Sequence, residues 1–194
     1  MIPESCDVGL KEWAGICQAL AAGEQSIILR KGGIDEVGGP GTFALQHPVF
    51  WLYPTHLHES QQGLRRAEIP RVSAHDLPPG KVPIAAFAVA TLLGRIEDES
   101  MLDAFQKFHV WSDETIRNRF FYQSPGLWVL ALRTYSRDST YVLDVTPEQE
   151  GCRSWVSLGQ ALSTSDAKPA IDDDSWSLVA DELQSLLRRT RTTQ

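Results

Sequence analysis

Apolar residues recur along the chain with two spacings, one typical of helices and one typical of strands. A stripe with spacings of three and four residues runs from Leu10 to Ala21. Asp7 precedes it as a suitable helix cap, and Gly23 follows as a suitable end. The pattern therefore predicts a first helix between Asp7 and Gly23.

Short apolar runs bounded by glycine or proline predict strands. The longest apolar stretch, residues 82–96, fits either a buried strand or a buried helix. Pro83 and Gly94 bracket it, and larger residues alternate with alanines, so we favour a strand. The other expected strands are 26–30, 43–45, 49–53, 127–135, 141–145 and 154–158.

Three further helices are expected in the second half of the chain. Ser100 and Ser112 are suitable caps for two of them, and a third begins at Ser175 with an apolar stripe from Trp176 to Leu187. Strands and helices do not alternate regularly, so a doubly wound parallel sheet is not expected.

The order of these elements predicts an α+β fold. We expect a mixed, mostly antiparallel sheet that could curl into a small barrel, flanked by about four helices. The expected organisation is one α+β domain over 1–162, a polar linker over 163–174, and a C-terminal helix over 175–194 that packs on the domain.

Charge and cysteine content narrow the function classes. The net charge of −7 excludes bulk attraction to nucleic acid or to an anionic membrane, so such binding would need a local patch. Three cysteines without a CxxC pair exclude a disulfide scaffold and a cysteine-based zinc site. The N-terminus resembles no signal peptide, and the longest uninterrupted apolar run, Ile84 to Leu93, is about half the length that a membrane span needs. We therefore expect a cytoplasmic protein with no membrane association.

A first candidate anion site lies at Arg30, Lys31, Gly32 and Gly33. Glycines at a strand end expose backbone N–H groups, and two cations stand beside them, so this segment could hold a phosphate or carboxylate. It matches neither the Walker A motif nor GxGxxG. The alternative interpretation is a charged strand end with a flexible turn.

Further candidate ligand-binding residues are spread along the chain. Arg153 and Trp155 share a face of an expected strand, where a guanidinium and an indole could stack a base. Arg117 lies on an expected helix, and Arg133 lies inside an apolar strand. A cation there needs a partner acid or a bound anion. Asp144 and Glu114 are the alternative ion-pair partners of Arg133.

A weaker candidate is a metal site at His56, His58 and Glu59. In an extended segment the two imidazoles share a face, and the carboxylate is adjacent. Nothing in the spacing selects a third, distant ligand, and such histidines are more often exposed or hydrogen-bonded. Two-metal nuclease chemistry also needs a carboxylate two residues before Lys31, where Leu29 stands.

Several motifs together resemble a bacterial family named domain of unknown function 1802, over roughly residues 8–160. They are Leu10–Ala14, the Leu-Arg-Lys-Gly-Gly-Ile run from Leu29, Phe50–Thr55 with His58, Arg133–Tyr135, and the Gly-Cys-Arg-Ser-Trp-Val segment from Gly151. The family has no assigned activity. Its members are sometimes associated with restriction-endonuclease-type domains, and the resemblance implies a part in restriction-modification or DNA processing.

Three hypotheses follow. The first is a binding module for nucleic acid or a nucleotide-like anion, with Arg30, Lys31, His58, Arg117, Arg133, Arg153 and Trp155 on one concave face and no cofactor. The second is a hydrolase or nuclease that uses a divalent metal at the His56 cluster. The third is an interaction subunit without chemistry of its own, for example one that binds a nuclease subunit.

Overall fold

The computed structural model describes residues 2–31, 45, 47–56, 63–65, 78–150 and 153–190. The strands are β1 (Ser5–Trp13), β2 (Ile27–Arg30), β3 (Val49–Thr55), β4 (Lys81–Ile96), β5 (Leu127–Asp144), β6 (Trp155–Ser163) and β7 (Lys168–Pro169). The helices are α1 (Ala14–Ala21), α2 (Leu102–Phe105), α3 (Asp113–Phe121) and α4 (Asp173–Arg189), with 3-10 turns at Glu99–Met101, Gln106–Phe108 and Pro147–Gln149.

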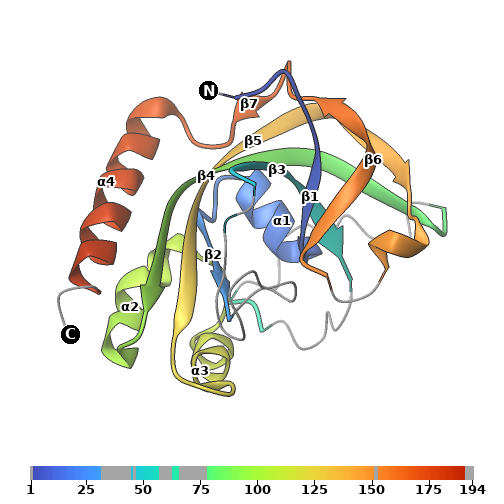
Figure 1. The fold of residues 1–194 in the computed structure, drawn as a ribbon. Helices are drawn as coiled ribbons and strands as arrows, with labels where there is room; N and C mark the ends of the chain where they lie inside the picture. Colours follow the sequence, from blue (N-terminus) through green and yellow to red (C-terminus); the bar gives the residue numbers. More distant parts are fainter. Residues whose placement is uncertain are drawn as a thin grey trace.

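All seven strands belong to one mixed sheet, in the order β2-β5-β4-β3-β1-β6, with β7 beside β5. Only the β1–β3 pair is parallel among the described strand pairs. The sheet curves around α1 (Figure 1). It is not a closed barrel, because the described parts of β2 and β6 end the path without pairing with each other. The α+β class and the mostly antiparallel sheet are therefore confirmed.

Two apolar cores lie within the curved sheet. The larger one joins α1, β2 and β5 to the helices α2, α3 and α4, and includes Leu20, Ile28 and Phe105. The smaller one gathers aromatic residues of β3, β4 and β5. In it, Trp51 meets Phe87 edge to face with ring centroids 5.3 Å apart. Residues of α1 belong to the larger core alone, so that core holds α1 against the sheet.

The first expected helix is half wrong. Its first part is strand β1, and α1 begins only at Ala14. Tertiary pairing overrides the helical spacing here, because β1 forms a ladder with β3 on one side and with β6 on the other. The expected end is confirmed: Gly23 has φ +75° and closes α1.

The two strands expected at 127–135 and 141–145 are one continuous strand, β5. The turn expected between them is wrong. Its polar residues lie where the β4–β5 register shifts, between the pairs Ile84–Tyr141 and Ala86–Ser136. The extra residues are accommodated as an irregularity of the ladder rather than as a reversal of the chain.

The expected helices are found with changes at their starts. The helix expected at Ser100 is a short α2 between two 3-10 turns, and its cap is Asp98, which accepts a hydrogen bond from the Ser100 backbone N–H. Ser112 caps α3 as expected, and α4 begins slightly earlier, with Asp172 as its cap. Among the described helices, none is both long and apolar enough to cross a bilayer.

Candidate functional site

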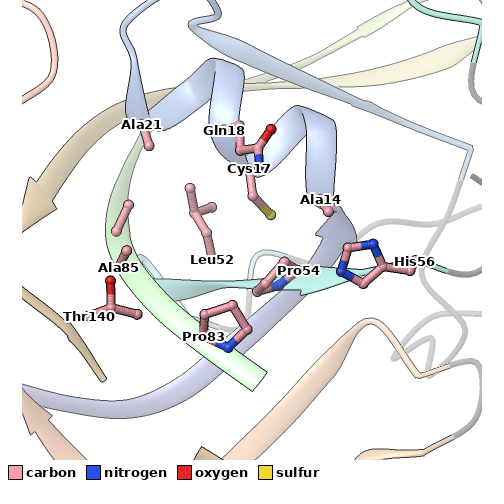
Figure 2. Close-up of a pocket in the computed structure, with 11 residues that line it drawn as sticks. Ala14, Cys17, Gln18, Ala21, Leu52, Pro54, His56, Pro83, Ala85 and Thr140 are labelled. Carbon is pink, nitrogen blue, oxygen red and sulfur yellow. The ribbon is translucent and has the colours of Figure 1, made fainter. Parts of the chain in front are cut away.

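A pocket lies between α1 and the concave side of the sheet (Figure 2). It holds about 120 Å³ and its walls are mostly apolar. Its described lining residues are Ala14, Cys17, Gln18, Ala21, Leu52, Pro54, His56, Pro83, Ala85, Ala86 and Thr140. An apolar cavity of about 150 Å³ admits benzene, so this one matches a single ring in size.

Helical spacing and small side chains create this pocket. The lining residues of α1 recur at positions 14, 17, 18 and 21, which form one face of a helix. On β4, Ala85 and Ala86 both line the pocket although they are neighbours. Successive residues of a regular strand point to opposite faces, and the register shift beside them explains the exception.

The polar groups in this pocket are few. The Oε1 atom of Gln18 is buried and has no hydrogen-bond partner among the described residues. A buried amide oxygen without a partner costs about 1–3 kcal/mol, so rotation of this amide toward a donor on a molecule bound in the pocket would be favoured. Burial, and then the charge of Glu12, raise the pKa of Cys17 well above its usual value. The Cys17 thiol therefore stays protonated, which disfavours thiolate chemistry.

A charged cluster adjoins the pocket at the junction of β1 and α1. The Sγ atom of Cys17 lies 3.7 Å from the carbonyl oxygen of Glu12, which links the two features. Glu12 is only 7% exposed, and its Oε2 lies 3.0 Å from Nη2 of Arg30. Among the described residues, that carboxylate oxygen has no aligned hydrogen bond, and the buried Nε of Arg30 has no partner. The pair is therefore close but incompletely satisfied.

A second guanidinium, that of Arg119, completes the cluster. It lies over the rings of Trp13 and Trp111, at 4.6 and 5.0 Å from their centroids. Burial lowers the pKa of Arg119; the charge of Glu12 opposes this and that of Arg30 adds to it. Two guanidiniums thus share one carboxylate in the described part of the chain, leaving a net positive charge beside two indole rings.

The other candidate cations lie apart from this cluster. Arg117 pairs with Glu99 and Asp103 on the surface. Arg133 pairs with Asp173 of α4, rather than with the two acids expected from the sequence. Its guanidinium lies 5.6 Å from the ring centroids of Tyr135 and Trp176. The structure therefore does not gather all the candidate cations on one concave face.

The remaining candidates divide between three places. The Nζ atom of Lys31 donates to the backbone carbonyl of Phe120 at the end of α3 and to those of Ser124 and Gly126 after it. Trp155 packs edge to face on Phe50, with centroids 5.1 Å apart, and Arg153 before it is exposed. Gly32, Gly33, His58 and Glu59 lie outside the described residues.

His56 lines the pocket, but its expected metal partners are not described. No group of three His, Cys, Asp or Glu side chains that could hold a metal ion occurs within the residues that the structure describes.

Sequence reasoning missed three contributors to this region: Glu12, Gln18 and Arg119. A signal existed for Arg119, since it follows Ile116 by three residues and precedes Phe120, and so belongs to the inner face of α3. Glu12 stands within an apolar stripe, which marks a partnered charge. Nothing in the sequence singles out the Gln18 amide.

The family model described as Domain of unknown function (DUF1802) matches residues 9–182, which is most of the chain. The chain belongs to the DUF1802 family. No curated protein matches this DUF1802 chain. The resemblance expected from the motifs is thus confirmed at the level of the family.

Solved structures provide a weaker similarity for this DUF1802 protein. The crystal structure of ASCH from Zymomonas mobilis is 13% identical, with a TM-score of 0.45, covering 89% of this chain and 93% of that one. Two point mutants of that protein match at 12% and 11% identity, with TM-scores of 0.41 and 0.44. They cover 92% and 89% of this chain and 98% and 96% of theirs. At these values the match says nothing of what the DUF1802 chain binds.

Proposed function

We propose that the protein is a binding module for a nucleotide-like ligand, free or as part of a nucleic acid. One flat ring occupies the pocket between α1, β3 and β4, and the anionic part of the ligand is attracted by the adjoining Arg30–Arg119 cluster. The observation that carries the proposal is that Gln18 lines a mostly apolar, ring-sized pocket, and its buried amide oxygen has no partner among the described residues.

The chemistry of a nucleobase fits these walls. Its faces are apolar and its edges carry hydrogen-bond donors, and exocyclic or ring N–H groups can satisfy an amide oxygen. The attached phosphate is favoured by two guanidiniums that share one carboxylate, on a molecule whose net charge is −7. A ligand without the anionic group should therefore bind less tightly, and added salt should reduce the difference.

The experiment titrates the four common nucleoside monophosphates and the matching nucleosides into the protein and follows binding by calorimetry. Gln18→Leu should weaken the preferred nucleotide about tenfold, since one hydrogen bond in a buried site contributes about 1–1.5 kcal/mol. Ala85→Leu should abolish binding because the added carbons fill the pocket. Ala161→Leu, the same change at an exposed position of β6, should leave binding unchanged.

The proposal is wrong if no nucleoside or nucleotide binds, or if Ala85→Leu binds as the parent does. A preference for nucleosides over nucleotides would remove the role given to Arg30 and Arg119. The expected links to restriction-modification and to a nuclease subunit stay predictions.

A further inference from the structure

Two aromatic side chains stand exposed at the end of α3. Phe121 is 51% exposed and Tyr122 is 62% exposed, whereas the preceding Phe120 is 1% exposed. The rings of Phe120 and Phe121 meet edge to face with centroids 5.1 Å apart. The exposed ring of Phe121 is therefore fixed by a buried neighbour. We call Phe121 and Tyr122 the α3 tip.

Hydrogen bonds from Lys31 hold the segment that carries the α3 tip. The Nζ atom of Lys31 donates to the carbonyl of Phe120 at 2.6 Å, to that of Gly126 at 3.0 Å, and to that of Ser124. Three bonds from one ammonium group fix both ends of the segment 120–126. Rings presented by a fixed backbone lose little conformational freedom on binding.

The surroundings of the α3 tip are basic. No carboxylate in the described part of the chain pairs with Lys31. Its ammonium group donates instead to uncharged backbone carbonyls. Arg95 lies against the same segment, since a Cβ added to Gly126 would meet its guanidinium at 3.1 Å. Burial, and then the charge of Arg95, lower the pKa of Lys31, so the two cations are close neighbours. Within the described residues, the acid paired with Arg95 is Glu97, at 3.4 Å.

Exposed rings beside two neighbouring cations, only one of which pairs with a carboxylate in the described part of the chain, suit a polyanion with flat, unpaired groups. We infer that the α3 tip is a stacking site for unpaired bases of a single-stranded nucleic acid, whose phosphates are attracted by Lys31 and Arg95. Every base offers a face to stack on, so the site reads no sequence. This inference rests on the proposed function and extends it: the physiological ligand is a polymer rather than a free nucleotide.

The test measures fluorescence anisotropy of labelled single-stranded oligonucleotides, from one to about twelve nucleotides long, with the full chain. The affinity of the parent protein should rise with oligonucleotide length by more than the larger number of equivalent binding positions on a longer strand explains. Tyr122→Ser with Phe121→Ser should lower the affinity for the longest strand about tenfold to a hundredfold, and leave mononucleotide binding unchanged. Tyr122→Phe should keep the parent affinity, because the ring remains.

A matched control is Leu178→Ser on α4, which changes a side chain that is 74% exposed elsewhere on the surface and should have no effect. All three residues changed, Phe121, Tyr122 and Leu178, are at least half exposed, and melting temperatures should confirm that each variant is folded.

Two outcomes separate this inference from the proposed function. If mononucleotides bind and longer strands bind no tighter, or if the double variant binds the long strand as the parent does, the stacking site is refuted and the pocket stands. If long strands bind and the double variant loses them while no mononucleotide binds, the stacking site is supported and the pocket is not.

Discussion

His109 should make the stability of the protein depend on pH between about pH 4 and pH 6.5. The side chain is 3% exposed, and its buried Nδ1 has no hydrogen-bond partner in the part of the chain that the structure describes. Burial, then the charge of Arg65, lower its pKa from 6.5 to about 4, with a smaller contribution from Arg119 and an opposing one from Asp113. The folded protein therefore holds the imidazole neutral where the unfolded chain would protonate it.

The sign and the size follow from proton linkage. Because the pKa is lower in the folded state, the unfolded chain binds more protons as the pH falls below 6.5, and stability is lost until about pH 4. Each unit of pKa difference corresponds to about 1.4 kcal/mol. Between about pH 7.5 and pH 5 the free energy of unfolding should therefore fall by about 2 kcal/mol through this group alone.

Urea denaturation of the parent and of His109→Leu at the two pH values measures this quantity. Carboxylates elsewhere titrate in both proteins, so only the difference between the two losses reports on His109. The parent should lose about 2 kcal/mol more than the variant, with equal m-values. Equal losses in the two proteins would refute the view that the folded state keeps His109 neutral.

Three further predictions concern contacts that stabilise the fold, or that leave its stability unchanged. Gly94→Ala should lower the free energy of unfolding, measured in denaturant, by about 1–3 kcal/mol, because the added Cβ would lie 2.6 Å from Cδ2 of the buried Leu187. The double variant with Leu187→Ala should lose less stability than the sum of the two single losses. Strict additivity would contradict the clash. Arg133→Leu should cost about 1–2 kcal/mol, since Arg133 is 16% exposed and binds both Asp173 and two rings; an unchanged midpoint would argue against that role. Lys168→Ala should leave the denaturation midpoint unchanged, because its ion pair with Asp138 is exposed on both sides.

Local chemistry in the sequence predicted most elements of the fold. The Ser112 cap of α3, the closing glycine after α1 and the long apolar strand β4 were all readable, because each depends on residues close in sequence. β1 was not readable, because its helical spacing is overridden by two partner strands. The single strand β5 was also missed, and two strands with a turn were expected in its place, because a polar stretch within a strand has the composition of a turn.

The candidate site was less predictable than the fold. Arg30 was expected to act in a ligand site, but its pairing with Glu12 and its closeness to Arg119 join segments that are distant in sequence. The role of Gln18 depends on the lack of a hydrogen-bond donor near its amide oxygen among the described residues. This lack appears only in the folded protein, where α1 packs against β3 and β4. Sequence patterns identify charged residues well, but they do not identify which carboxylate each one meets.

The place of β1 in the sheet has a consequence for synthesis of the protein on the ribosome. Among the described strands β1 is translated before the others, yet one of its two partners, β6, begins at Trp155, and the backbone N–H of Thr164 bonds to the carbonyl of Glu4. β1 must therefore wait for the translation of β6 before both its edges are covered. Contacts between segments this distant in sequence slow folding. An unpaired strand edge can also pair with another chain, which leads to aggregation. We expect the newly made protein to depend on chaperones more than its modest size would suggest.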